Sequence, residues 1–206
     1  MKTLLLGMAI LICCASFTSK DYDEIDSYGV YQKNWAKVSK NNKVGFIDKH
    51  GTLIVPAVYN EIDAFGIYKS NLAKVKSNGK FGFIDKYGVE IVPPKYCTID
   101  NFNIYRKHWA KVEIEGKFGF IDKFGVEIVQ PKYSFIDNFN IYRKHWAKVE
   151  IEGKFGFIDK YGTEVIPSIY DEIGYFNIQK TKYAKAIKNG KEVFISKYGY
   201  EVTSIN

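Results

Sequence analysis

The chain has 206 residues, of which 46% are hydrophobic and 17% aromatic, and its formal net charge is +7. This length allows one or two domains. Five prolines in the whole chain exclude a Pro-rich disordered protein, and the hydrophobic content is that of a folded one.

The first 16 residues have the pattern of a signal peptide. Lys2 precedes an uninterrupted apolar run at residues 4–14, which is shorter than the roughly 20 apolar residues of a membrane-spanning helix. Cys14 and Ser16 are small enough to precede a signal-peptidase cut before Phe17. We therefore expect export and removal of residues 1–16. A buried N-terminal helix or strand is the alternative.

A lipid anchor is a second alternative for this segment, through Cys13 or Cys14. The small residue that usually precedes a lipidated cysteine is missing, because Ile12 precedes Cys13. This anchor is the one membrane contact that the sequence suggests. After cleavage only Cys97 certainly remains, so no intramolecular disulfide is expected.

The rest of the chain is a tandem repeat with a period of 37 residues. The letters GFIDK begin at Gly45, Gly82, Gly119 and Gly156, and a decayed copy begins at Val193. Residues 99–123 recur without change as residues 136–160. We divide the chain into five repeats: residues 22–58, 59–95, 96–132, 133–169 and 170–206.

Each repeat begins with a predicted β-hairpin. In the third repeat, residues 109–114 and 117–122 are β-rich, alternating runs separated by Glu115 and Gly116, and Asn-Gly takes that place in the second and fifth repeats. Such a pair favours a two-residue turn with positive φ. The turn pairs Val112 with Gly119. Because a single unit of three strands is too small to bury enough surface alone, we expect stacked neighbouring repeats to supply the core.

A second turn and a third strand follow the hairpin. Asp122 begins a turn that Gly125 ends in a left-handed conformation. Residues 126–129 form the third strand, which we expect Pro131 to end. The segment from Tyr133 onward is a connector or a short fourth strand.

This repeat resembles the WG-repeat family of bacterial proteins over residues 22–206, on the pattern K-F-G-F-I-D-K-Y-G-x-E-x-V-P-P-x-Y. The Trp-Gly that names the family reads Phe-Gly in three repeats, for example at Phe118 and Gly119. The resemblance implies an all-β repeat array and no common reaction. We predict an open, twisted array. A closed, propeller-like ring is the alternative, although a blade commonly takes about 40–45 residues.

The sequence shows no convincing catalytic or metal site. Its histidines, His50, His108 and His145, lack zinc-ligand spacing. The aspartate of each D-K-x-G segment is explained by turn hydrogen bonding. No phosphate-binding glycine motif or nucleophile elbow is present. We therefore expect no cofactor, no metal and no enzymatic activity.

Lysine recurs in three ladders, beginning at Lys37, Lys43 and Lys49. We interpret them as solvated residues that discourage strand pairing. A cationic stripe for anionic polymers is the alternative, which interleaved carboxylates weaken. Nucleic acid is not an expected partner of an exported chain.

The candidate binding residues lie in an aromatic and basic segment that occurs twice. Tryptophan and arginine are common in protein hot spots, and two copies would give a ligand two equivalent contacts. Packing of the tryptophans against the neighbouring repeat is the alternative. The residues are Arg106, Lys107, His108, Trp109, Arg143, Lys144, His145 and Trp146.

These patterns together predict a non-enzymatic binding or interaction scaffold of the bacterial envelope or exterior. Its partner would be a protein or an envelope polymer. A hydrolase of a cell-surface polymer is the alternative, although an enzyme should concentrate unique polar residues in one repeat rather than repeat them in register.

Export can be tested by mass spectrometry of the mature N-terminus. We expect the chain recovered from its native host to begin at or near Phe17, because Lys2 and the apolar run direct export and cleavage. An intact Met1 on protein recovered from the cytoplasm would contradict this prediction.

Overall fold

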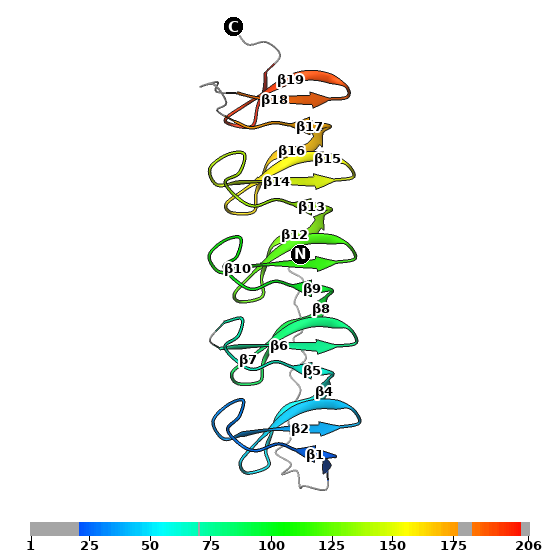
Figure 1. Cartoon of the computed structure of the whole chain (residues 1–206), viewed down its shortest axis with the longest axis vertical. Coiled ribbons are helices and arrows are strands. Elements are labelled where there is room, and N and C mark those ends of the chain that lie inside the picture. Colours follow the sequence, from blue (N-terminus) through cyan, green and yellow to red (C-terminus); the bar gives the residue numbers. More distant parts are fainter. Residues whose placement is uncertain (1–20, 70, 177–182, 203–206) are drawn as a thin grey trace, which may run out of the picture. The chain divides into compact units, whose positions relative to one another are not determined.

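The computed structural model describes residues 21–69, 71–176 and 183–202. These residues form twenty β-strands in five four-stranded sheets (Figure 1). Strand order within every sheet follows the chain, and no sheet of the described residues closes into a barrel, as expected of an open array. The predicted all-β repeat fold is confirmed. In this part of the chain, no helix has the length and apolarity needed to cross a membrane.

The sheets take up successive stretches of the chain. The first holds β1 (Glu24–Ile25), β2 (Trp35–Lys40), β3 (Lys43–Asp48) and β4 (Leu53–Tyr59). The second holds β5 (Glu61–Ile62), β6 (Leu72–Ser77), β7 (Lys80–Asp85) and β8 (Glu90–Tyr96). The third holds β9 (Thr98–Ile99), β10 (Trp109–Ile114), β11 (Lys117–Asp122) and β12 (Glu127–Tyr133). The fourth holds β13 (Phe135–Ile136), β14 (Trp146–Ile151), β15 (Lys154–Asp159) and β16 (Glu164–Tyr170). The fifth holds β17 (Glu172–Ile173), β18 (Tyr183–Lys188), β19 (Lys191–Ser196) and β20 (Glu201–Val202).

The chain divides into two compact units. The first unit runs to Asn78 and includes Phe83–Glu90, and the second contains Gly79–Gly82 and continues from Ile91. The third, fourth and fifth sheets all belong to the second unit. The candidate binding segments therefore lie within one unit.

The hairpin that opens the third sheet has the predicted register. Val112 of β10 pairs with Gly119 of β11. The two residues of the connecting turn, Glu115 and Gly116, have φ values of 51° and 74°, as a type I′ turn requires. The same register recurs in the first, fourth and fifth sheets.

The turn between the second and third strands also follows the prediction. The N–H of Gly125, at φ 82°, donates to the carbonyl of Asp122 at 3.0 Å. The Oδ1 atom of Asp122 accepts the backbone N–H groups of Phe124 and Val126 at 2.8 and 3.0 Å. Each such aspartate is thus used inside its own turn, as turn chemistry predicts.

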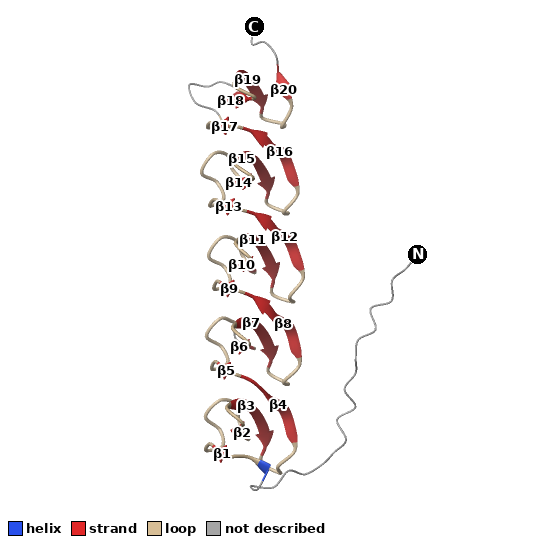
Figure 2. Cartoon of the chain, turned by 90° about the vertical axis from the view of Figure 1, so that its right-hand side faces the viewer, coloured by secondary structure: helices blue, strands red, loops and turns tan. Residues whose placement is uncertain are grey.

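The third strand of each repeat differs from the prediction. β12 continues through Pro131 and leads toward β13 of the next sheet (Figure 2). Its pairing with β11 shifts register between Phe118 and Phe120, which places a bulge opposite Gly119. Proline is tolerated at a bulge because it lacks the N–H that a regular ladder needs. The expectation that proline ends the strand is therefore wrong.

Neighbouring repeats share their cores, as predicted. In one cluster, Trp109, Phe120 and Val129 of the third repeat pack with Ala147 and Val149 of the fourth. A face of large side chains thus meets a face of small ones. Equivalent clusters join the first repeat to the second and the fourth to the fifth. A single small sheet could not bury this surface alone.

A hydrogen bond between side chains joins successive sheets at the margin of these cores. The hydroxyl of Tyr96 donates to Glu127 at 2.8 Å, and the carboxylate also pairs with Lys95. Burial and then this carboxylate raise the pKa of Tyr96, while Lys95 is the main group that lowers the pKa of Glu127. The equivalent pairs are Tyr59 with Glu90, Tyr133 with Glu164 and Tyr170 with Glu201.

Replacement of Gly119 by alanine should cost about 1–3 kcal/mol of unfolding free energy because the site has no room for a methyl group. A Cβ there would lie 2.3 Å from the carbonyl oxygen of Val129, so the clash is with the bulge and not with Val112 as the hairpin register alone suggested. Chemical denaturation measures the loss.

Gly174→Ala is the matched control. Its Cβ would lie 3.4 Å from the nearest atom, the Lys185 backbone oxygen. The alanine also reduces the conformational entropy of the unfolded chain. We expect no loss of stability from this change. Equal losses for the two variants would contradict the close approach at Gly119.

Candidate functional site

The two predicted binding segments are tight turns that lead into β10 and β14. In the third repeat, the N–H of Trp109 donates to the carbonyl of Arg106 at 3.0 Å. The N–H of His108 donates to the side-chain oxygen of Asn103 at 2.7 Å, and His108 has a φ of 67°. The same contacts recur around Arg143. Both turns are therefore held by hydrogen bonds within their own segments, one to a backbone carbonyl and one to an asparagine side chain.

The tryptophans of these segments are core residues. Trp109 is 8% exposed and Trp146 is 9% exposed. The Trp109 ring lies 5.3 Å from the ring of Phe120 and 6.0 Å from that of Phe139, which comes from the next repeat. The hypothesis that both indoles offer a free face to a ligand therefore gives way to the packing interpretation.

The arginines cover these buried rings from outside. The guanidinium carbon of Arg106 lies 5.3 Å from the Trp109 ring centre, and that of Arg143 lies 4.2 Å from the Trp146 ring centre. Burial lowers the pKa of Arg143, and its Nη1 atom is buried without a hydrogen-bond partner among the described residues. Cation–π attraction offsets part of that desolvation.

The other basic residues of the segments are exposed and gather across two repeats. Lys107, His108, Lys144 and His145 are exposed. Desolvation first, and then the positive charges of Lys160, Lys144 and Arg106, lower the pKa of His145. The structure thus brings the basic turn of the third repeat close to that of the fourth.

The exposed aromatic side chains lie elsewhere than predicted, on the D-K-x-G turns. Tyr161 is 65% exposed and Tyr198 is 68% exposed. Sequence reasoning missed these residues. A signal was present, because strand alternation gives an aromatic residue at the third position of a polar turn no partner in the core. The exposed aromatic residues at the third position of these turns are Tyr87, Phe124, Tyr161 and Tyr198.

Each of these rings carries the preceding lysine above it. The ammonium nitrogen of Lys160 lies 4.8 Å from the Tyr161 ring centre, and that of Lys197 lies 4.9 Å from the Tyr198 ring centre. We call the three pairs of the second unit the turn row. It consists of Lys123 with Phe124, Lys160 with Tyr161 and Lys197 with Tyr198.

The carboxylates beside the turn row are already bound. Asp159 accepts the N–H groups of Tyr161 and Thr163 at 2.8 and 3.0 Å. Glu164 accepts the hydroxyl of Tyr133. These contacts engage the carboxylate oxygens, and Glu164 also pairs with Lys132. The turn row itself presents aromatic rings and cations.

The other two lysine ladders have structural contacts, which the interpretation as solvated lysines missed. In the first, Lys111 lies 4.7 Å from the Tyr105 ring centre and 5.0 Å from that of Phe118. In the second, Lys80 donates to the sulfur of Cys97 at 2.9 Å, which lowers the pKa of that thiol. In the third ladder, each lysine of the turn row lies over an exposed ring of its own turn.

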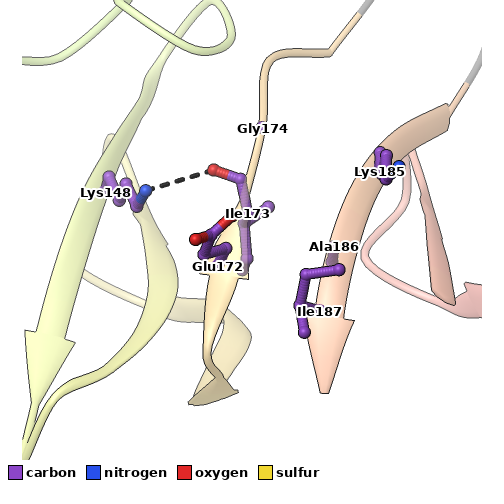
Figure 3. Close-up of a pocket in the computed structure, with 7 residues that line it drawn as sticks. All are labelled: Lys148, Glu172, Ile173, Gly174, Lys185, Ala186 and Ile187. Atoms are coloured by element: carbon purple, nitrogen blue, oxygen red, sulfur yellow. Dashed lines mark hydrogen bonds between the residues drawn. The ribbon is translucent and has the colours of Figure 1, made fainter. Parts of the chain in front are cut away.

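A cavity of about 420 Å³ lies between the fourth and fifth sheets (Figure 3). Lys148 points into it and donates to the carbonyl oxygen of Ile173 at 3.1 Å. Burial is the main cause that lowers the pKa of this lysine. Gly174 stands where the other four repeats have aspartate, so loss of that side chain enlarges the cavity. The lining of mixed charge includes Glu172 and Lys185.

The described residues contain no cluster of three or more His, Cys, Asp or Glu side chains able to hold a metal ion. The aspartates of the D-K-x-G turns and the glutamates equivalent to Glu127 recur in register and bind turn N–H groups or tyrosine hydroxyls, as in the pair of Tyr96 and Glu127. This arrangement repeats a structural contact rather than concentrating reactive groups.

Trp109→Ala should lower the unfolding free energy by about 3–5 kcal/mol because it empties a buried aromatic cluster. The control Arg106→Ala should cost less than about 1 kcal/mol, since that side chain lies at the surface of the cluster. Thermal or chemical unfolding measures both. If both variants lost similarly little unfolding free energy, the Trp109 indole would again be a candidate ligand contact.

No curated protein matches the chain. Among solved structures, the dihydro-heme d1 dehydrogenase NirN is 14% identical, with a TM-score of 0.31, over 84% of this chain and 43% of that one. PorZ of Porphyromonas gingivalis is 10% identical (TM-score 0.29, 88% and 26%), and BamB of Moraxella catarrhalis is 10% identical (TM-score 0.27, 88% and 62%). The chain spans less than two thirds of each of these proteins.

A family model described as "WG containing repeat" matches four consecutive segments, at residues 45–81, 81–118, 118–155 and 155–191. These segments cover more than half of the chain and follow the repeats that form the five sheets. The chain therefore belongs to the family of proteins with WG containing repeats.

Proposed function

We propose that the chain is a non-enzymatic interaction scaffold of the bacterial envelope or exterior, which binds an envelope polymer or a protein partner through the exposed turns of its repeats. The N-terminal pattern of Lys2 and the apolar run supports export. A lipid at Cys13 or Cys14 would keep the scaffold at a membrane surface.

The observation that carries this proposal is the pair of a half-buried lysine and an exposed aromatic ring on each turn of the row. A folded chain gains little from holding a tyrosine such as Tyr198 at 68% exposure. Aligned exposed rings beside unpaired positive charge are instead typical of contact surfaces. The basic residues Lys144 and His145 extend the same surface around Lys160.

Repetition of these groups supports binding over catalysis. A reaction centre needs acid, base or nucleophile held in one place with shifted pKa values. The turn aspartates and the glutamates that join successive sheets each recur in four repeats and serve the fold. A repeated surface instead gives a ligand several equivalent contacts, which raises affinity when one molecule reaches more than one.

Binding to envelope fragments tests the proposal. The purified chain should sediment with envelope fragments in a saturable manner, and Lys160→Glu with Lys197→Glu should weaken this binding at least about fivefold by reversing two surface charges. Thermal midpoints should stay unchanged because both lysines lie on the surface.

Lys40→Glu with Lys191→Glu is the matched control, because it makes the same charge change on exposed lysines at the opposite end of the hairpins. It should retain at least most of the binding. Equal losses for the two variants would reduce the effect to net charge. Release of soluble fragments from the envelope with time would identify a hydrolase instead.

A further inference from the structure

The turn row of the second unit is a rigid support. The N–H groups of Tyr161 and Thr163 both bind Asp159, and Gly162, at φ 83°, sits so close to the preceding repeat that a Cβ would lie 2.7 Å from a Val129 methyl carbon. The backbone that carries the ring is thus fixed before any ligand arrives. Little conformational entropy is lost when such a group binds.

The fifth repeat keeps this geometry with different chemistry. Ser196 replaces the turn aspartate, and its hydroxyl accepts the N–H groups of Tyr198 and Tyr200 at 3.3 and 3.1 Å. Tyr198 remains 68% exposed, with Lys197 above its ring. The exposed pair thus persists where the residue that forms the turn has changed.

The pairs of the row offer two kinds of contact. An aromatic ring such as that of Tyr161 presents a flat apolar face with a negative π-cloud, which suits the polarised C–H groups on the face of a sugar ring. Lys160 presents an ammonium group at the same place, and Lys144 and Arg106 add positive charge nearby. A partner must therefore combine flat apolar faces with negative charge.

The spacing of the row indicates the form of that partner. The same pair recurs every 37 residues at Phe124, Tyr161 and Tyr198, and residues 99–123 and 136–160 are identical. A repeated support is matched by a repeated ligand, whereas a peptide of varied sequence does not call for equal contacts at each step. We propose that the turn row binds a linear anionic polysaccharide, with sugar rings against the aromatic side chains and carboxylates against the lysines. This inference rests on the proposed scaffold function.

Polygalacturonate, a uronic acid polymer, is the test ligand, with dextran of matched length as the neutral polymer and polyglutamate as the acidic polypeptide. The full chain should bind polygalacturonate and not dextran in calorimetry at low salt. Tyr161→Ala with Tyr198→Ala leaves the net charge unchanged and should weaken this binding about tenfold, as loss of central aromatic contacts does in other interfaces.

Tyr28→Ala with Phe135→Ala is the control, because it removes two exposed rings outside the turn row. It should leave the affinity within about twofold, as truncation of residues outside a contact surface does. Lys160→Gln with Lys197→Gln should weaken binding and make it less sensitive to salt, since it removes two of the cations that salt screens.

Three results would overturn the proposal: no binding of polygalacturonate, equal losses in the two aromatic variants, or polyglutamate binding as tightly with no response to the tyrosine changes. The last would mean that charge alone attracts the ligand. The chain could still bind envelope fragments in a way that depends on Lys160 and Lys197, but fail to bind polygalacturonate. In that case the proposed ligand class is wrong and the proposed scaffold function stands.

Discussion

The carbonyl oxygen of Val129 lies 2.3 Å from where a Cβ at Gly119 would be, and this close crossing shapes the whole repeat. It allows β12 to bulge over β11 and to turn toward the next sheet. The same approach recurs at Gly45, Gly82 and Gly156. Without a glycine at this point the third strand would stay in register with the hairpin, and the contact between repeats would lose its geometry.

The bulge brings two unlike faces together. Phe120, Trp109 and Val129 form a face of large side chains, and Ala147 and Val149 of the following repeat form a face of small ones. Close packing of such faces stabilises a stack of sheets that are individually too small to have a core. The small face is therefore as necessary as the aromatic one, which explains why alanine recurs at the second position of the first strand of each hairpin, as in β10.

Sequence reasoning located the hairpins and both turns because Gly116 and Gly125 can adopt the positive φ that these turns need, and Asp122 can bond nearby backbone N–H groups. Sequence reasoning did not identify the residues that pack over Trp109, because the alternation of apolar and polar residues shows which face of a strand a side chain occupies and not which residues contact it. These residues include Phe139, 30 positions away. Pro131 was misread for a similar reason, since a bulge depends on the tertiary path of the strand. The exposed rings of Tyr161 and Tyr198 were not predicted as binding residues, because tryptophan beside arginine is the more common pattern of a protein hot spot.

The bond between Tyr96 and Glu127 joins residues 31 positions apart, and the shared cores likewise join adjacent repeats. Closing such loops costs little chain entropy compared with pairing the two ends of a domain of this length. A new repeat can therefore settle on the one before it as soon as its hairpin and third strand have emerged during synthesis. The order of folding need not wait for the end of the chain, and growth from one end toward the other is the natural path for such an array.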